Sequence, residues 1–102
     1  MIYIVDIDNT ICDTVNSDYE NSTPIPDRIK KINELYNSNT IIYWTARGMA
    51  SGRDIEELQI LTENSLKDWG CNYHELRMQK PQYDVWIDDK ADWIFRENGE
   101  EE

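Results

Sequence analysis

The sequence has few basic residues: 10 Lys and Arg stand against 21 Asp and Glu among its 102 residues. The net charge of -11 repels polyanions and leaves no basic stripe for a phosphate backbone. We therefore expect no nucleic-acid partner. An acidic chain suits divalent cations, although the plainer interpretation, that acidic surfaces keep small proteins in solution, stays open.

The sequence also lacks a long apolar run and has only two cysteines. No segment approaches the roughly 18 apolar residues of a membrane span, and residues 1–10 lack the basic start and long apolar core of a signal peptide. We therefore expect a soluble, cytoplasmic protein without a membrane partner. Cys12 and Cys71 lie far apart without metal-ligand spacing, which favours free thiols over a disulfide or a zinc site.

Four segments of the sequence predict β-strands. Short, continuous runs rich in Ile, Val and Tyr at residues 1–5, 40–44 and 83–87 are typical of strands that are covered on both faces. A more polar run at residues 71–78 predicts an edge strand. The length allows one domain with one modest core, which we place at residues 1–97, before an acidic tail at 98–102.

Apolar residues at helical spacing predict two helices between these strands, within residues 26–39 and 51–70. Ser51 or Asp54 is expected to cap the second helix, and a third, short helix is expected at residues 90–98. This order of elements predicts an α/β protein, specifically a Rossmann-like three-layer α/β/α sandwich with a mainly parallel sheet.

Chemically active side chains follow the predicted strands. Parallel strands direct their C-terminal ends to one rim of the sheet, where ligands of such sheets bind. Clustered carboxylates favour a hard cation such as Mg²⁺, and hydroxyl and cationic groups hold phosphate oxygens. This set of side chains therefore indicates phosphoryl transfer. Its members are Asp6, Asp8, Thr45, Arg47, Lys80, Asp88 and Asp89.

The two carboxylates of "DIDNT" at residues 6–10 suit different tasks. Asp6, at the strand end, can attack phosphorus as a covalent nucleophile. Asp8 would give a proton to the leaving group and later take one from water, as general acid and then base. A loop doublet that caps the following turn is the structural alternative.

Four motifs, taken in order, resemble those of the haloacid dehalogenase-like (HAD) superfamily. They are "DIDNT" at 6–10, "WTARG" at 44–48, "KPQYD" at 80–84 and "WIDDK" at 86–90. The resemblance implies a HAD-like fold and a Mg²⁺-dependent phosphatase that works through an aspartyl phosphate. It also implies the site residues: Asp6 and Asp8 for catalysis, Thr45 and Lys80 for the phosphate, and Asp6, the backbone carbonyl of Asp8, Asp88 and Asp89 for the metal.

The chain departs from that superfamily in two respects. Asn9 stands where most relatives have Gly, a minor change because Asn tolerates left-handed backbone. The chain also has no room for a cap domain, which leaves a short flap at residues 11–23. Capless relatives accept large substrates or recruit a neighbouring subunit as a lid, so a homo-oligomer is possible.

The expected substrate is a small phosphorylated sugar, nucleotide or similar metabolite. Polynucleotide 3′-phosphatases have the same capless architecture, but the negative net charge of this chain would oppose the approach of a nucleic acid strand. A non-catalytic module that binds Mg²⁺ or phosphate is the alternative from another class. For three side chains the sequence leaves two roles open. Arg47 binds the phosphorylated substrate or pairs with an acidic residue, and His74 is a structural residue or a catalytic base. Tyr19 packs in the core or stacks on a substrate ring.

Overall fold

The computed structural model describes residues 1–49 and 52–90. Its main sheet contains three parallel strands in the order β1-β4-β5. Their bounds are Ile2–Val5 for β1, Thr40–Trp44 for β4 and Glu75–Arg77 for β5. The predicted α/β class and the mainly parallel sheet are therefore confirmed. Because all three strands run the same way, their C-terminal ends lie at one rim.

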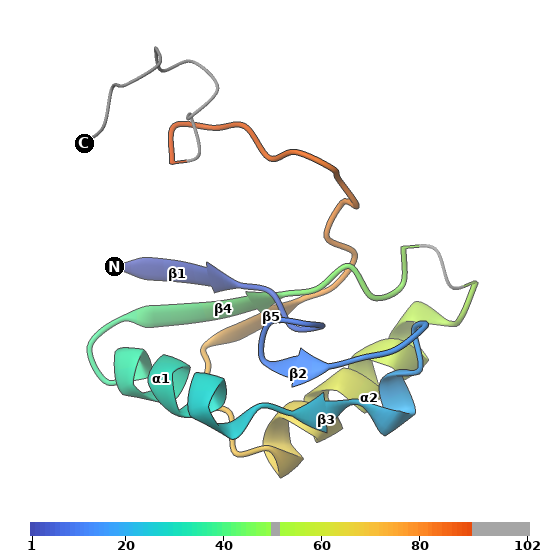
Figure 1. Ribbon diagram of the computed structural model, residues 1–102, viewed down its shortest axis with the longest axis horizontal. Coiled ribbons are helices and arrows are strands. Elements are labelled where there is room, and N and C mark those ends of the chain that lie inside the picture. Colours follow the sequence, from blue (N-terminus) through green and yellow to red (C-terminus); the bar gives the residue numbers. More distant parts are fainter. Residues whose placement is uncertain (50–51, 91–102) are drawn as a thin grey trace.

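Two helices connect these strands and lie on the same side of the sheet (Figure 1). Helix α1 spans Pro26–Tyr36 and helix α2 spans Ile55–Asp68. Asp54 is the N-cap of α2, since its side chain accepts a hydrogen bond from the Glu56 amide at 3.0 Å, as predicted. Neither helix, nor the short 3-10 helix described below, is long and apolar enough to cross a membrane.

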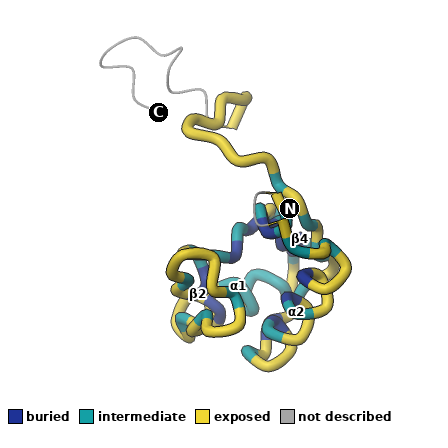
Figure 2. The backbone as a smooth tube through the Cα atoms, turned by 90° about the vertical axis from the view of Figure 1, so that its right-hand side faces the viewer, coloured by how far each residue is buried: buried dark blue, intermediate teal, exposed yellow. Residues whose placement is uncertain are grey.

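The core lies between the sheet and the two helices (Figure 2). Alternate strand residues point into it, among them Val5 and Tyr43, whereas Ile2 and Ile4 on the other face are 69% and 49% exposed. The described residues thus form two layers of the predicted three. The helix expected at residues 90–98 lies, apart from its first residue, outside the described part of the chain, as does the acidic tail.

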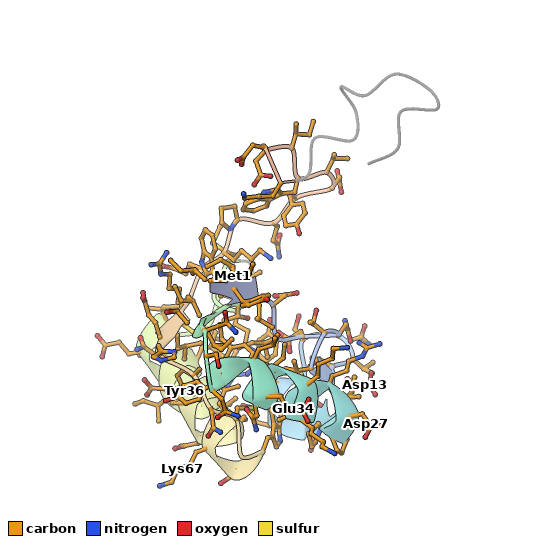
Figure 3. The ribbon with its side chains drawn as sticks, turned by 90° about the vertical axis from the view of Figure 1, so that its left-hand side faces the viewer. Met1, Asp13, Asp27, Glu34, Tyr36 and Lys67 are labelled. Carbon is orange, nitrogen blue, oxygen red and sulfur yellow. The ribbon has the colours of Figure 1, made fainter. Side chains whose placement is uncertain are left out.

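The predicted flap, residues 11–23, folds as a small antiparallel ribbon. Strand β2, Cys12–Asp13, pairs with strand β3, Thr23–Pro24, and the 3-10 helix η1, Tyr19–Asn21, lies between them. Figure 3 shows Asp13 in β2 at the same end of the molecule as Asp27, at the start of α1. A β-bridge between Asp8 and Cys12 joins the ribbon to the segment that directly follows β1.

The prediction of a strand at residues 83–87 is wrong. This segment forms no strand in the structure, and it runs away from the sheet with exposed side chains (Figure 1). Its aromatic rings instead contact each other and the sheet: Trp86 lies 5.2 Å from Tyr83 and 6.3 Å from Trp44, between ring centroids. An apolar run favours extended backbone but does not by itself supply a pairing partner.

Gly48, in the loop after β4, has a φ of 91° in the left-handed region, and a Cβ there would meet Cδ1 of Ile55. We expect Gly48→Ala to lower the free energy of unfolding by more than about 1 kcal/mol, measured by thermal unfolding. Gly70→Ala is the matched control, because its φ of 73° is similar but an added Cβ meets no described atom within 4 Å. An equal loss of unfolding free energy in both variants would show that the predicted contact with Ile55 has no effect.

Candidate active site at the C-terminal rim of the sheet

A groove of about 340 Å³ opens where β1 ends, and Asp6 and Lys80 both line it. Asp6 directly follows β1. The Lys80 amide donates to the Thr45 carbonyl at 2.8 Å, which holds the loop after β5 against the end of β4. Within residues 1–49 and 52–90, no side chain hydrogen-bonds or ion-pairs with the Asp6 carboxylate. The predicted nucleophile and the predicted phosphate-binding cation therefore share one groove.

Asp8 has a different environment, because a buried arginine binds it in a bidentate ion pair. Arg47 Nη2 donates to Asp8 Oδ1 at 2.8 Å and Arg47 Nε donates to Oδ2 at 3.0 Å. Arg47 is only 1% exposed, whereas the Asp8 side chain keeps 22% exposure. Of the two roles left open for Arg47, pairing with an acid is the one seen in this geometry. Its binding to phosphate stays a prediction.

Two further groups fix the Arg47 guanidinium. Its Nη1 donates to the Thr62 hydroxyl at 3.0 Å, and that hydroxyl donates in turn to the Leu58 carbonyl at 2.7 Å. The Tyr19 ring of the flap covers the guanidinium, with 4.4 Å between Cζ and the ring centroid. Tyr19 thus contacts the site through Arg47. Stacking of its ring on a substrate stays a prediction.

The flap also supplies a hydroxyl to Asp8. Thr14 Oγ1 donates to Asp8 Oδ1 at 2.6 Å, and because its proton is then used, Ser22 Oγ is the donor in the 2.6 Å contact with Thr14. Cys12 Sγ approaches Asp8 Oδ1 at 3.8 Å and the Ile7 carbonyl at 3.6 Å. Oδ1 of Asp8 is therefore crowded with donors, whereas Oδ2 accepts from Arg47 alone among the described residues.

Burial is the largest influence on Cys12, and it raises the pKa of the thiol. The neighbouring Asp8 carboxylate acts in the same direction, while the Thr14 hydrogen bond and Arg47 act against it. The raised pKa keeps Cys12 in the thiol form, which can donate to Asp8 and Ile7. Cys12 Sγ is therefore a supporting donor to Asp8 and to the Ile7 carbonyl.

A second groove of about 320 Å³ adjoins the first, because Ala46 and Gln82 line both. Asp8 and Asn9 line the second groove from the strand side. Asn9 has a φ of 62°, which confirms that asparagine takes left-handed backbone here, and its Oδ1 accepts from the Thr14 amide at 3.2 Å. Asp6 therefore lines one of two adjoining grooves and Asp8 lines the other.

Thr45 lies at the end of β4 as predicted, but it is fully buried. Its hydroxyl accepts a hydrogen bond from the Arg47 amide at 3.2 Å, which stabilises the turn that positions Arg47. Thr45 lines neither groove. Its role on the phosphate stays a prediction.

Asp88 and Asp89 lie on the exposed segment after β5. Asp88 Oδ2 accepts from Trp86 Nε1 at 2.6 Å, its Oδ1 accepts from the Lys90 amide at 2.8 Å, and Asp89 lies 3.9 Å from the Lys90 ammonium. The carboxylate donors fit the chemistry of Mg²⁺. However, no group of three metal-binding side chains converges within the described ranges, so the predicted metal set is not assembled here and stays a prediction.

His74 has structural partners near β5. Its Nδ1 accepts from the Ile41 amide at 3.1 Å, and its ring stacks on Tyr36 with 4.6 Å between centroids. Its amide donates to the Ile41 carbonyl at 2.9 Å. These contacts extend the pairing of β4 with the chain before β5, and His74 lines neither of the two grooves. The structural role is the one that the geometry supports.

Sequence reasoning missed Thr62 and Thr14. Thr62 had a visible signal, because it occupies the middle of a buried stripe on α2, between Leu58 and Leu66, where an apolar residue is expected. A buried hydroxyl in such a stripe needs a polar partner. Thr14 had no comparable signal, since Thr in a flap is ordinary.

A larger groove of about 610 Å³ lies elsewhere, along α1. Ile29, Asn33 and Trp69 line it, and none of the residues discussed above as candidates for catalysis does so. Its size alone gives no chemistry.

No protein-family model and no curated protein matches the chain significantly. The chain is similar to the crystal structure of an MCSG target from Vibrio cholerae, with 28% sequence identity and a TM-score of 0.74. The similarity covers 88% of this chain and 80% of that chain. The architecture described above therefore also occurs in a solved structure.

Proposed function

We propose that the protein is a phosphatase that hydrolyses phosphomonoesters of small metabolites through an aspartyl phosphate on Asp6. One observation carries the proposal: two carboxylates, two residues apart, have opposite environments at one rim. Asp6 has no described side-chain partner and shares a groove with Lys80, whereas Asp8 is held by Arg47. Paired acids with different environments are the usual basis for dividing a nucleophile from a proton donor.

The reaction would proceed in two displacements. A carboxylate oxygen of Asp6 forms a bond to phosphorus while the bond to the leaving alcohol breaks. Asp8, which would enter the cycle with a proton taken up from solvent, gives that proton to the alcohol. Water then attacks phosphorus, Asp8 takes the proton of the water, and the bond to Asp6 breaks. Inorganic phosphate leaves and both carboxyl groups return to their starting states. The Lys80 ammonium would bind phosphate oxygens throughout.

Mg²⁺ would neutralise charge on the phosphoryl group when bound. The residues that would hold it are Asp6, the backbone carbonyl of Asp8, Asp88 and Asp89.

Incubation with p-nitrophenyl phosphate and Mg²⁺ tests the proposal. We expect the wild-type protein to release p-nitrophenol, EDTA to stop the release, and Asp6→Asn to release none above background. Equal release by both proteins would contradict the proposal. A wild-type protein that turns over neither this ester nor a panel of sugar phosphates, nucleotides and 3′-phosphorylated oligonucleotides would instead indicate a non-catalytic binding module.

A further inference from the structure

The groove of about 320 Å³ adjoins the groove that Asp6 and Lys80 line, since Ala46 and Gln82 belong to both. A phosphomonoester consists of a phosphate and of a group that leaves with the bridging oxygen. With the phosphate between Asp6 and Lys80, the adjoining groove is the space that the leaving group would enter. Its volume is at the low end of the range of about 300–1,000 Å³ for small-molecule sites, which suits a group with one ring.

No cation that the structure describes in this groove is available to an anionic ligand. Asp8 and Arg47 are the charged residues among those that line it, and they neutralise each other in their ion pair. Arg47 is 1% exposed, and its three side-chain nitrogens each donate to Asp8 or Thr62. A second phosphate or a carboxylate on the leaving group would therefore lie beside the Asp8 carboxylate without a counterion. This environment favours an uncharged leaving group.

The groove offers amide and hydroxyl groups instead of cations. Asn16 and Ser17 line it from the flap, and Gln82 lines it from the loop after β5. All three side chains are exposed, and none of them has a hydrogen-bond partner among the described residues. Amides and hydroxyls both donate and accept hydrogen bonds, as do the hydroxyls of a sugar. The lining therefore matches a leaving group that is rich in hydroxyls.

The backbone of the flap holds Asn16 and Ser17 in a tight turn. Their φ angles of 52° and 60° are left-handed, and the Asp18 amide donates to the Val15 carbonyl at 2.9 Å across the turn. Such angles in residues other than glycine cost free energy and are concentrated at ligand-binding sites. Tyr19, just after the turn, packs on the buried guanidinium at 4.4 Å. The flap thus presents both side chains before a ligand binds, which lowers the cost of binding.

We infer that the groove lined by Asn16, Ser17 and Gln82 binds the leaving group and selects an uncharged, hydroxyl-rich one, so that the substrate is the monophosphate of a single sugar. The inference rests on the proposed function and narrows its substrate class. A nucleotide fits less well, because its base needs a stacking partner. Tyr19 is the one aromatic residue in the lining, and the guanidinium of Arg47 occupies one face of its ring.

A comparison of substrates on the wild-type protein tests the selection. The sugar monophosphates are glucose 6-phosphate and ribose 5-phosphate, and the competitors are fructose 1,6-bisphosphate and adenosine 5′-monophosphate. We expect kcat/KM for at least one sugar monophosphate to exceed that for both competitors by at least about 10-fold, since a second phosphate meets no free cation and a base meets few apolar groups. A smaller or reversed difference would overturn the inference.

Two variants test the residues of the groove. Asn16→Gly removes the amide but keeps the turn, because glycine takes positive φ readily, and Gln82→Ala removes the amide on the other side. We expect each variant to lower the ratio of kcat/KM for the preferred sugar phosphate to that for p-nitrophenyl phosphate about 5-fold, mainly through KM. Asn64→Ala is the matched control, because Asn64 is exposed on α2 and lines neither groove, so its ratio should stay at the wild-type value.

The outcomes separate the inference from the proposed function. A lower ratio in either variant supports the assignment of the groove, whereas an unchanged ratio in both overturns it. A wild-type protein that hydrolyses p-nitrophenyl phosphate but neither sugar monophosphate would overturn the inference and leave the phosphatase proposal intact. A wild-type protein that hydrolyses none of these esters would overturn the proposed function and, with it, the inference.

Discussion

Replacing Asp8 by asparagine is expected to lower the free energy of unfolding by about 3 kcal/mol, because the substitution leaves the Arg47 guanidinium buried without an anion. This value is at the low end for broken buried ion pairs, since the Asp8 side chain keeps 22% exposure. Asp6→Asn is the same chemical change two residues earlier. It removes a carboxylate with no described side-chain partner, so we expect a change within about 0.5 kcal/mol.

The two variants are expected to separate fold from chemistry. Urea denaturation measures the loss in Asp8→Asn, and wild type and Asp6→Asn should unfold at nearly the same urea concentration. Release of p-nitrophenol should fall at least about 1,000-fold in Asp6→Asn, because an amide is a poor nucleophile towards phosphorus. A marked unfolding of Asp6→Asn, or an Asp8→Asn protein as stable as wild type, would contradict these assignments.

A second large effect is expected at alkaline pH. Burial raises the pKa of the Cys71 thiol to about 11, and it raises the pKa of the Tyr43 hydroxyl above its ordinary range. Both groups hold their protons more tightly in the folded chain than in the unfolded chain. The contribution of Cys71 is therefore complete below about pH 9 and is lost as the pH rises towards 11, whereas that of Tyr43 is complete below about pH 10 and is lost above it, at up to roughly 1.4 kcal/mol per pH unit for each group.

Urea denaturation at pH 8, 9, 10 and 11 measures this loss. Cys71→Ala and Tyr43→Phe each remove one of the two titrating groups, so the stability of each variant should fall less steeply with pH than that of the wild type. Tyr43→Phe also removes a buried hydroxyl whose neighbour is the Cys71 thiol, a weak hydrogen-bonding group, so its stability at pH 8 should not fall by more than about 1 kcal/mol. Unchanged slopes in both variants would refute the assignment.

Most of the described fold could be predicted because its signals are local. The apolar runs at β1 and β4, the helical spacing of α1 and α2, and the cap at Asp54 each depend on neighbouring residues. Residues 83–87 have the same local signal as β1, yet they form no strand. Pairing is a tertiary event, and local composition could not show that these aromatic rings contact each other and Trp44 instead.

The candidate site was predictable to the extent that parallel strands share a rim. That rule placed Asp6 beside Lys80, and the two do line one groove. It could not choose between the roles of Arg47, because the choice depends on Tyr19 and Thr62, which come from the flap and from the middle of α2. Contacts between elements far apart in the chain leave no pattern in a single sequence.

Two of the contacts that join the flap to the body respond differently to ionic strength. Arg53 pairs with Glu20 of the flap and with Glu57 of α2 at the surface, where dissolved salt screens charges. Tyr19 contacts a guanidinium that solvent scarcely reaches, so salt weakens this contact much less. Rising ionic strength therefore loosens the flap from its outer end inward. The Arg53 ion pairs weaken first, and the contact between Tyr19 and Arg47 persists.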